Sequence, residues 1–386
     1  MRPRTRAVHA GAPHPGPGLP AEASPPIHQA SAPLFDRLED LEAAFEDKAF
    51  FYRRYGSSNQ QSLEAAVRDL EGGDKEDIAL VVASGMAALT LACLALNPGH
   101  KKVVGATGLY GGTHGLISRE LPRLGIPSAI VDLADAEVLN REIDDAALLV
   151  VETISNPAMR VADIPALAAA AHAAGAALLV DNTFASPVLC RPLELGADAV
   201  MESATKYLCG HADAMAGALV LGAEAGARAV ELSRLHGSVA APLDCWLVLR
   251  GIRTLGLRVE AACRSAQTIA EYLASHAAVA RVDYPGLGPD PVAARVLDRG
   301  FGGMLSFTLH GGEAAVMRAC DRMRMITLMP SLADVATTVS HPTSTSHRGM
   351  TEDQLVAAGT SPGMLRLSVG IEDVDDILGD LELALA

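Results

Sequence analysis

A lysine preceded by two hydroxyl residues is the feature of this chain most able to do chemistry. Lys206 follows Ser203 and Thr205 in the stretch MESATKYLCGHAD, and residues 197–201 form an apolar run typical of a buried strand. A lysine is costly to bury unless it is paired or used in a reaction. Hydroxyls beside it could hold a phosphate, so the pattern indicates a Schiff base between Lys206 and pyridoxal phosphate (PLP). This segment alone leaves open a solvated lysine in a surface loop.

Three other places in the sequence offer what PLP needs. Ser84, Gly85 and Met86 open a predicted helix, whose N–H groups could bind the phosphate, although an ordinary serine cap explains the same residues. Asp181 ends an apolar strand and could keep the pyridine nitrogen protonated, or it could cap a turn. Tyr110, in a glycine-rich segment that we expect to be a turn, could stack on the ring or pack beside a flexible loop. Together these weak signals favour a PLP site.

The elements that must position these residues alternate between strands and helices. Strands are expected at residues 102–104, 129–132, 148–152, 176–181, 197–201 and 216–221, with helices at 62–73, 84–98 and 164–174. Such alternation predicts a mostly parallel sheet with helices on both faces and a ligand at the carboxyl ends of the strands. Beyond residue 242, a helical pattern to residue 276, strands at 279–284, 304–310 and 365–369, and helices at 313–323 and 374–385 predict a smaller α/β domain.

These patterns divide the chain into three parts. Residues 1–57 look irregular, with prolines and glycines crowded into residues 13–26, as in an arm that contacts a neighbouring subunit or in a mobile tail. Residues 58–242 form the predicted PLP-binding domain, and residues 243–386 form the smaller C-terminal domain.

Composition limits the classes of partner and compartment. The chain has 386 residues, 49% of them hydrophobic, and a net charge of -15, which argues against binding to nucleic acid or to an anionic membrane. Its longest apolar window, residues 164–180, reads as a helix, a turn and a strand rather than a membrane span. Six scattered cysteines and the lack of an apolar signal at the N-terminus predict a cytoplasmic protein with reduced thiols.

With these motifs in place, the sequence resembles the γ-subfamily of PLP enzymes of cysteine and methionine metabolism. That family includes cystathionine γ-synthase, cystathionine γ-lyase, methionine γ-lyase and the O-acylhomoserine sulfhydrylases. The resemblance runs from Thr5 to the last helix and rests on FYRRYGSSNQQSLEAAV, SGMAA, LYGGT, ETISNP, LLVDNTFASP, RPLELGADAV, SATKYLCGHAD and LRLSVGIED. It implies the fold type I of PLP-dependent transferases, like aspartate aminotransferase, and a homodimer or homotetramer with shared active sites.

The resemblance also implies roles for individual residues. Lys206 would hold PLP covalently, Asp181 would pair with its ring nitrogen, and Tyr110 would stack on the ring and transfer protons. The phosphate would contact Gly85, Met86, Ser203 and Thr205, together with Tyr52 and Arg54 from a neighbouring subunit. Asn156, Ser331 and Arg366 would orient the substrate, with Arg366 clamping its α-carboxylate.

Departures from the family pattern bear on the substrate. Cystathionine enzymes typically place glutamates at the positions of Phe51 and Pro330, and these apolar residues cannot pair with the distal ammonium of cystathionine. Methionine γ-lyases often carry a cysteine where this chain has Gly112, as the cystathionine enzymes do, and residues 57–59 read Ser-Ser-Asn in place of the usual Asn-Pro-Thr. Among the members of the family, this sequence is most similar in type to the methionine γ-lyases.

We therefore expect a PLP-dependent carbon–sulfur lyase that removes the γ-thiol of L-methionine. Cystathionine γ-lyase, γ-replacement on an O-acylhomoserine, and a PLP-fold binding protein without catalysis are the alternatives. No metal is expected, because His341 and His347 have no third ligand at a useful spacing, and His211 and Asp213 are read as structural.

Overall fold

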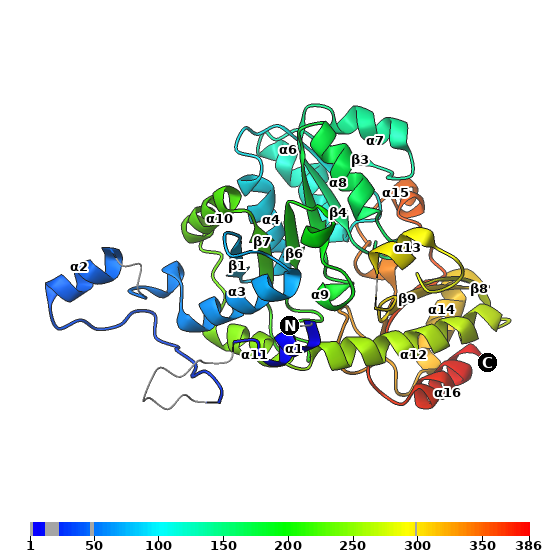
Figure 1. The fold of residues 1–386 in the computed structure, drawn as a ribbon. Helices are drawn as coiled ribbons and strands as arrows, with labels where there is room; N and C mark the ends of the chain where they lie inside the picture. The colour runs from blue at the N-terminus through cyan, green and yellow to red at the C-terminus, as the bar shows by residue number, and fades with distance from the viewer. Residues whose placement is uncertain (1–2, 12–22, 47–49, 298) are drawn as a thin grey trace.

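The computed structural model describes residues 3–11, 23–46, 50–297 and 299–386. It contains two sheets flanked by helices (Figure 1). The larger sheet, in spatial order, consists of β1 (Ile78–Val82), β7 (Gly217–Leu221), β6 (Ala199–Glu202), β5 (Ala177–Asp181), β4 (Ala146–Glu152), β2 (Lys102–Ala106) and β3 (Ser128–Val131). Neighbouring strands of the larger sheet are parallel, except for the two pairs that include β7. This confirms the prediction of a mostly parallel sheet.

The helices on the larger sheet follow from the sequence pattern. Figure 1 shows α4 and α10 on one face and α7 and α8 on the other. The helices of this part are α3 (Ser58–Glu71), α4 (Gly85–Ala95), α5 (Gly111–Gly115), α6 (Leu121–Arg123), α7 (Ala136–Ile143), α8 (Ile164–Ala173), α9 (Ser186–Leu189), α10 (Ala223–His236) and α11 (Pro242–Ile252), with a π-helical turn η2 (Leu116–Glu120) and a 3-10 turn η3 (Pro192–Leu195).

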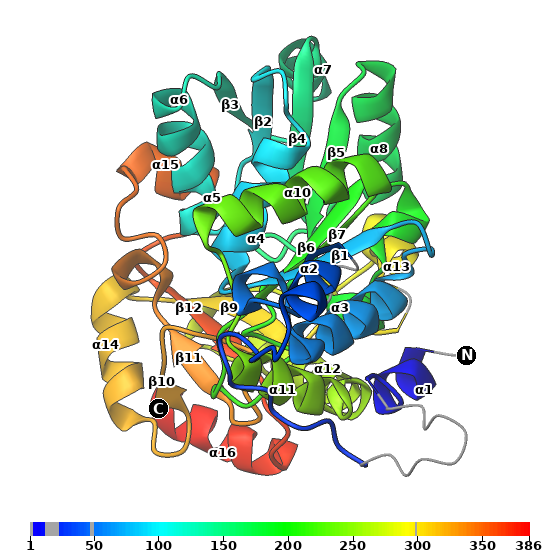
Figure 2. The same ribbon diagram turned by 90° about the vertical axis from the view of Figure 1, so that its left-hand side faces the viewer.

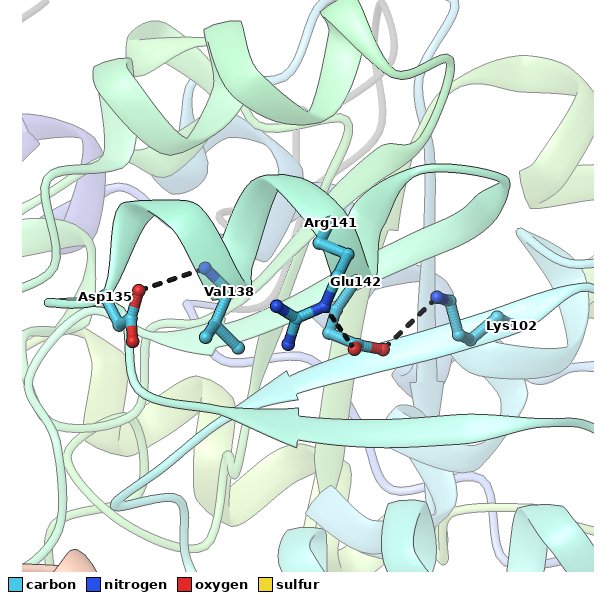
Figure 3. A network of polar contacts seen from close by, with 5 residues as sticks. All are labelled: Lys102, Asp135, Val138, Arg141 and Glu142. Carbon is cyan, nitrogen blue, oxygen red and sulfur yellow. Dashed lines mark hydrogen bonds and ion pairs between the residues drawn. The ribbon is translucent and has the colours of Figure 1, made fainter.

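Polar contacts cap α7 and join it to β2 of the larger sheet (Figure 3). The Asp135 carboxylate accepts a hydrogen bond from the Val138 N–H at 3.0 Å and so caps the first turn. Glu142, near the end of α7, accepts from Lys102 Nζ of β2 at 3.4 Å and from Arg141 Nε at the same distance. These contacts hold a helix that contributes no residue to the lining of the candidate site.

The smaller sheet is mostly antiparallel. It is ordered β10 (Thr327–Leu328), β11 (Thr338–Ser340), β12 (Met364–Ser368), β9 (Met304–Leu309) and β8 (Val279–Asp283). Around it lie α12 (Leu255–Ser275), α13 (Pro291–Val296), α14 (Gly312–Arg322), α15 (Glu352–Ala357), α16 (Val374–Leu385) and the turn η4 (Pro342–Ser344). The first half of α12 packs in the core of the larger sheet through Leu255 and Val259, and its second half packs in the smaller core through Ile269 and Leu273. The domain limits at residues 57 and 242 stay a prediction.

The N-terminal segment is more structured than its composition suggests. Part of the predicted irregular stretch, residues 12–22, lies outside the described residues. Residues Pro3–Val8 form helix α1, which packs on the body because Ala7 is buried and the Arg6 guanidinium donates to the Asp69 carbonyl at 2.8 Å. The expectation of an irregular segment is therefore wrong for α1 and for α2 (Leu38–Glu46). Helix α2 projects away from the body in Figure 1 and lies in front of it in Figure 2, where that side faces the viewer.

The unusual Ser-Ser-Asn sequence at residues 57–59 starts helix α3. The Ser57 hydroxyl accepts from the Gln60 N–H at 3.2 Å, as an N-cap does. The Asn59 side chain donates to the Pro26 carbonyl and accepts from the His28 N–H, both at 2.8 Å. The departure from the family pattern thus caps a helix and fastens the preceding segment to the body.

No helix in the described part of the chain combines the length and the apolar character needed to cross a membrane.

The first prediction concerns the smaller core. Phe307 on β9 is fully buried, so Phe307→Ala should lower the free energy of unfolding by about 3–5 kcal/mol through lost burial and an unfilled cavity. Chemical denaturation followed by circular dichroism measures this, and Val356→Ala, at a side chain 71% exposed, is the control. Equal denaturation midpoints for the two variants would contradict the assignment of this core.

Candidate active site

A cavity of about 470 Å³ opens where the carboxyl ends of β4, β5 and β6 meet the start of α4. Parallel α/β sheets typically bind ligands at this edge. The cavity brings together most of the site residues predicted from the sequence: Gly85, Met86, Tyr110, Asn156, Asp181, Ser203, Thr205, Lys206, Ser331 and Arg366. Segments far apart in the chain therefore converge on one space.

Lys206 lies in the turn that follows β6. Its Nζ donates a hydrogen bond to the Ser331 hydroxyl at 2.7 Å, which joins the larger-sheet side of the cavity to the segment after β10. Burial, and after it the positive charge of Arg366, lowers the pKa of Lys206 to about 8. The neutral amine, the form that attacks an aldehyde or takes a proton, is therefore far more populated near neutral pH than in an ordinary lysine.

The start of α4 and the residues after β6 form a cradle suited to an anion. Ser84 caps α4 by accepting from the Ala87 N–H at 3.2 Å. A Cβ atom at Gly85 would lie 2.8 Å from Ser203 Cβ, so the two backbones approach too closely for a side chain at position 85. The backbone donors of a helix N-terminus and the Ser203 and Thr205 hydroxyls thus border the same space, as a phosphate requires.

Two carboxylates stand side by side at the strand ends. Asp181 on β5 pairs in register with Glu152 on β4. Burial raises the pKa of Asp181, while the Thr183 hydroxyl and N–H, which both bind its Oδ1, lower it. A buried anion of this kind is stabilised by a cation placed against it, which is what a protonated pyridine ring supplies.

Tyr110 is held by its backbone. The Glu152 carboxylate accepts from the Tyr110 N–H at 2.6 Å. The residues after Tyr110 form helix α5 rather than the expected turn, so that expectation is wrong. The reason is close packing: a Cβ at Gly111 would lie 2.0 Å from the Ser346 carbonyl oxygen, which shows that the glycine admits a neighbouring backbone.

Arg366 and Asn156 form a clamp on the opposite wall. Arg366 Nη1 donates to Asn156 Oδ1 at 2.9 Å, while Arg366 Nε is buried and has no hydrogen-bond partner. Burial lowers the pKa of Arg366 to about 10, and the negative charge of Glu152 opposes this effect. An anion such as a substrate carboxylate would accept a hydrogen bond from the free donor of this buried guanidinium.

Three predicted residues do not border this cavity. Phe51 stacks on Phe45, with ring centroids 3.8 Å apart, and the Arg54 guanidinium donates to the Arg234 carbonyl at 2.8 Å. Tyr52 is 43% exposed. These residues belong to the segment beside α2, and their predicted contact with a neighbouring subunit stays a prediction.

The two histidines near the cavity have local partners. His341 contacts the Ser344 hydroxyl at 2.7 Å, and His347 contacts the Asn156 carbonyl at 3.2 Å. Within the described residues, no group of three or more His, Cys, Asp or Glu side chains could hold a metal ion.

Sequence reasoning missed several residues of the site. Glu152, Thr183, Met215 and Arg348 all border the cavity. Glu152 carried the same signal as Asp181, a carboxylate at the end of a predicted strand, and could have been found by that rule. Arg348 carried no such signal, because only the folding of residues 341–348 toward Asn156 brings it there.

The residues of the cavity fit PLP. A lysine with a lowered pKa, a helix N-terminus with two hydroxyls, a buried aspartate and an exposed tyrosine ring match the aldehyde, the phosphate, the ring nitrogen and the ring face of that cofactor. Lys206, Gly85, Met86, Ser203, Thr205, Asp181 and Tyr110 would hold it. The close approach at Gly85 agrees with this fit, because it brings the start of α4 next to the Ser203 hydroxyl.

A second prediction tests the anion cradle. Gly85→Ala should weaken PLP binding about tenfold or more, because its methyl group forces the start of α4 away from Ser203. Titration of the apoprotein with PLP measures the affinity, and Gly379→Ala, where nothing lies within 4 Å, is the control. Unchanged affinity for Gly85→Ala would remove this contact from the phosphate site.

A third prediction follows from the lowered pKa of Lys206. The neutral amine forms as pH rises through about 8, so the rate at which apoprotein takes up PLP should rise with a midpoint near that pH. Arg366→Met removes a neighbouring positive charge and should move the midpoint upward. Stopped-flow absorbance measures it, and the reaction of PLP with N-acetyl-lysine, followed in parallel, gives the midpoint of an ordinary lysine. A wild-type midpoint near the ordinary lysine value of about 10.4 would contradict the account.

Comparisons with known proteins agree with this site. The model of the family described as Cys/Met metabolism PLP-dependent enzyme matches residues 4–386. The chain is 38% identical to an L-methionine γ-lyase of Pseudomonas putida and 40% identical to a cystathionine γ-synthase of Mycobacterium tuberculosis, each over 390 residues that cover 99% of this chain and 96% of the relative.

The structural comparison gives the same answer. A solved structure from Campylobacter jejuni that contains a pyridoxyl-lysine phosphate has a TM-score of 0.91 and 28% identity, and covers 100% of both chains. The predicted fold of PLP-dependent transferases, the cofactor and the expectation of an enzyme of this type are confirmed. The chain belongs to the Cys/Met metabolism PLP-dependent enzyme family.

Proposed function

We propose that the enzyme catalyses γ-elimination of L-methionine, which with one water gives methanethiol, α-ketobutyrate and ammonia. The observation that carries this proposal is the distribution of charge around the cavity. Its acidic residues are Glu152 and Asp181, and both already have roles at the strand ends. No further carboxylate of the described lining remains to pair with the distal ammonium of cystathionine, whereas Pro330 and Met215 offer apolar contact to a methylthio group.

The clamp orients the amino acid. Arg366, with its unpartnered Nε, binds the α-carboxylate, and Asn156 fixes the guanidinium plane. Ser331, already hydrogen-bonded to Lys206, keeps the amine beside the substrate. The Cα–H bond is thereby presented to the amino group of Lys206.

Lys206 and Tyr110 move the protons. PLP, when bound, supplies an electron-withdrawing ring that takes up the charge left when Cα loses its proton. Lys206 in its neutral form removes the proton from Cα, as its lowered pKa favours. Once that proton has left its amino group, the neutral amine removes a second proton, from Cβ. Tyr110, held by Glu152, donates a proton to the departing sulfur.

γ-Replacement on an O-acylhomoserine is the second candidate. The relatives named cystathionine γ-synthase are as similar to this chain as those named methionine γ-lyase. Gly112 also favours this branch, because a Cβ there would lie 2.6 Å from the Tyr110 ring, so a cysteine at this position would displace the tyrosine. γ-Elimination and γ-replacement would use the same cofactor contacts. They differ in the group that leaves Cγ and in whether a sulfur nucleophile then attacks.

We also propose that a second copy of the chain completes the site. Phe51, Tyr52 and Arg54 are not among the residues that line the cavity of their own chain, and Phe51 stacks on Phe45 of α2, the helix that projects from the body (Figure 1). Exposed apolar side chains accompany them, with Leu34 fully exposed and Leu38 69% exposed. Such a surface suits burial against another subunit. The expected cytoplasmic location stays a prediction.

The test of the proposed function compares substrates on the holoenzyme. Methionine should release thiol and α-ketobutyrate faster than O-acetylhomoserine plus sulfide forms homocysteine, and faster than cystathionine is cleaved. Faster consumption of the ester with sulfide would overturn the proposal in favour of replacement.

A fourth prediction concerns Tyr110. Tyr110→Phe should lower kcat for methionine by roughly 10²–10⁴-fold, because the leaving sulfur loses its proton donor. Steady-state release of methanethiol measures it, with Tyr272→Phe on α12 as the matched control. A near-normal kcat in Tyr110→Phe would assign the proton to another donor.

A further inference from the structure

A third cation, Arg348, borders the active-site cavity without a role in the chemistry above. The positively charged side chains around the cavity are Lys206, Arg366 and Arg348. Lys206 bonds Ser331 and Arg366 bonds Asn156. Arg348 is exposed, so it lies at the solvent side of the cavity.

The other polar groups on the same segment are already engaged. The Ser344 hydroxyl contacts His341 Nδ1 at 2.7 Å, the Thr345 hydroxyl donates to the His341 carbonyl at 2.7 Å, and the Ser346 hydroxyl contacts His347 Nδ1 at 2.8 Å. Among the described residues, by contrast, no ion pair or side-chain hydrogen bond involves the Arg348 guanidinium. Its donors are available to a ligand.

The segment that carries Arg348 is fixed to the substrate clamp. His347, the preceding residue, contacts the carbonyl of Asn156, whose side chain holds Arg366. The Ser346 carbonyl packs against Gly111, next to Tyr110. The backbone that carries Arg348 is therefore tied to the wall that holds Asn156 and Arg366, and the exposed Arg348 side chain lies at the solvent side of the cavity.

No acid of the cavity competes for this guanidinium. Glu152 is buried beneath the Tyr110 backbone, and Asp181 is bound by Thr183. A substrate anchored at its α-carboxylate by Arg366 would extend its γ-substituent toward the open side, where an anion would meet an unpaired guanidinium. Guanidinium binds carboxylate through two parallel hydrogen bonds, which gives both affinity and orientation.

We propose that Arg348 reads the far end of the substrate and gives the enzyme a preference for homocysteine thioethers whose S-substituent ends in a carboxylate over neutral thioethers of the same size. This inference rests on the proposed γ-elimination and its anchoring of the α-carboxylate. Methionine remains a substrate through the apolar contacts, and the acidic thioether gains one further contact.

The test uses two thioethers that differ in charge alone. S-carboxymethyl-homocysteine and S-carbamoylmethyl-homocysteine match in shape, and the ratio of their kcat/KM values cancels general effects of a substitution. The wild-type holoenzyme should prefer the carboxylate about 5- to 10-fold, and added salt should reduce this preference because the side chain is exposed. Arg348→Gln should bring the ratio close to one, Arg348→Lys should restore part of it, and Arg318→Gln on α14 should leave it unchanged.

Binding of the same two compounds keeps the test independent of turnover. Their dissociation constants are measured from the change in the visible band of bound PLP, and the ratio should follow the same pattern across the variants. A wild-type ratio near one, or a ratio unchanged in Arg348→Gln, would overturn the role of Arg348. If neither thioether releases its thiol while the binding ratio still depends on Arg348, the proposed elimination is wrong and the anion contact stands.

Discussion

The candidate active site depends on the burial of one amino group, that of Lys206, because removal from water disfavours its charged form. Lys206 lies in a largely buried cavity with the guanidinium of Arg366 as its neighbour, and both the loss of solvent and the like charge favour the neutral amine. Arg366 experiences the same burial, but it has Glu152 nearby and remains a cation. One cavity thus holds an amine that is readily neutral and a guanidinium that stays charged, because the two side chains differ in how readily they lose a proton.

The parallel sheet explains why the acids are in the right place. Neighbouring parallel strands end at the same edge, so Glu152 and Asp181 are paired by register rather than by sequence distance. Their closeness raises the pKa of Glu152, beyond the effect of burial, while the Tyr110 N–H and Arg366 oppose this. Glu152 therefore connects the Tyr110 backbone, which donates a hydrogen bond to it, with the charges of Asp181 and Arg366.

Local signals in the sequence carried much of this arrangement. The Ser84 cap, the Asp181 strand end and the hydroxyls before Lys206 each reflect a short-range requirement that one segment satisfies alone. The glycine-rich segment after Tyr110 misled, because Gly111 is needed for the approach of Ser346, far away in sequence, and not for a turn. Helix α10 was not predicted, since its surface-rich sequence shows little apolar periodicity.

Features that need a long-range partner could not be found in the same way. Arg348 enters the cavity because His347 contacts the Asn156 carbonyl. Helix α1 forms because Ala7 and Arg6 find partners on the body. The proposed roles of Phe51, Tyr52 and Arg54 would need a second chain, and the family resemblance is what suggested them.

The most direct measurement is to locate the covalently bound cofactor. Borohydride reduction of the holoenzyme, followed by digestion and mass spectrometry, should find the pyridoxyl phosphate on the peptide that contains Lys206. The remaining lysines, Lys48, Lys75, Lys101 and Lys102, should stay unmodified and serve as internal controls. A label on one of these lysines in place of Lys206, or no label after incubation with PLP, would contradict the account.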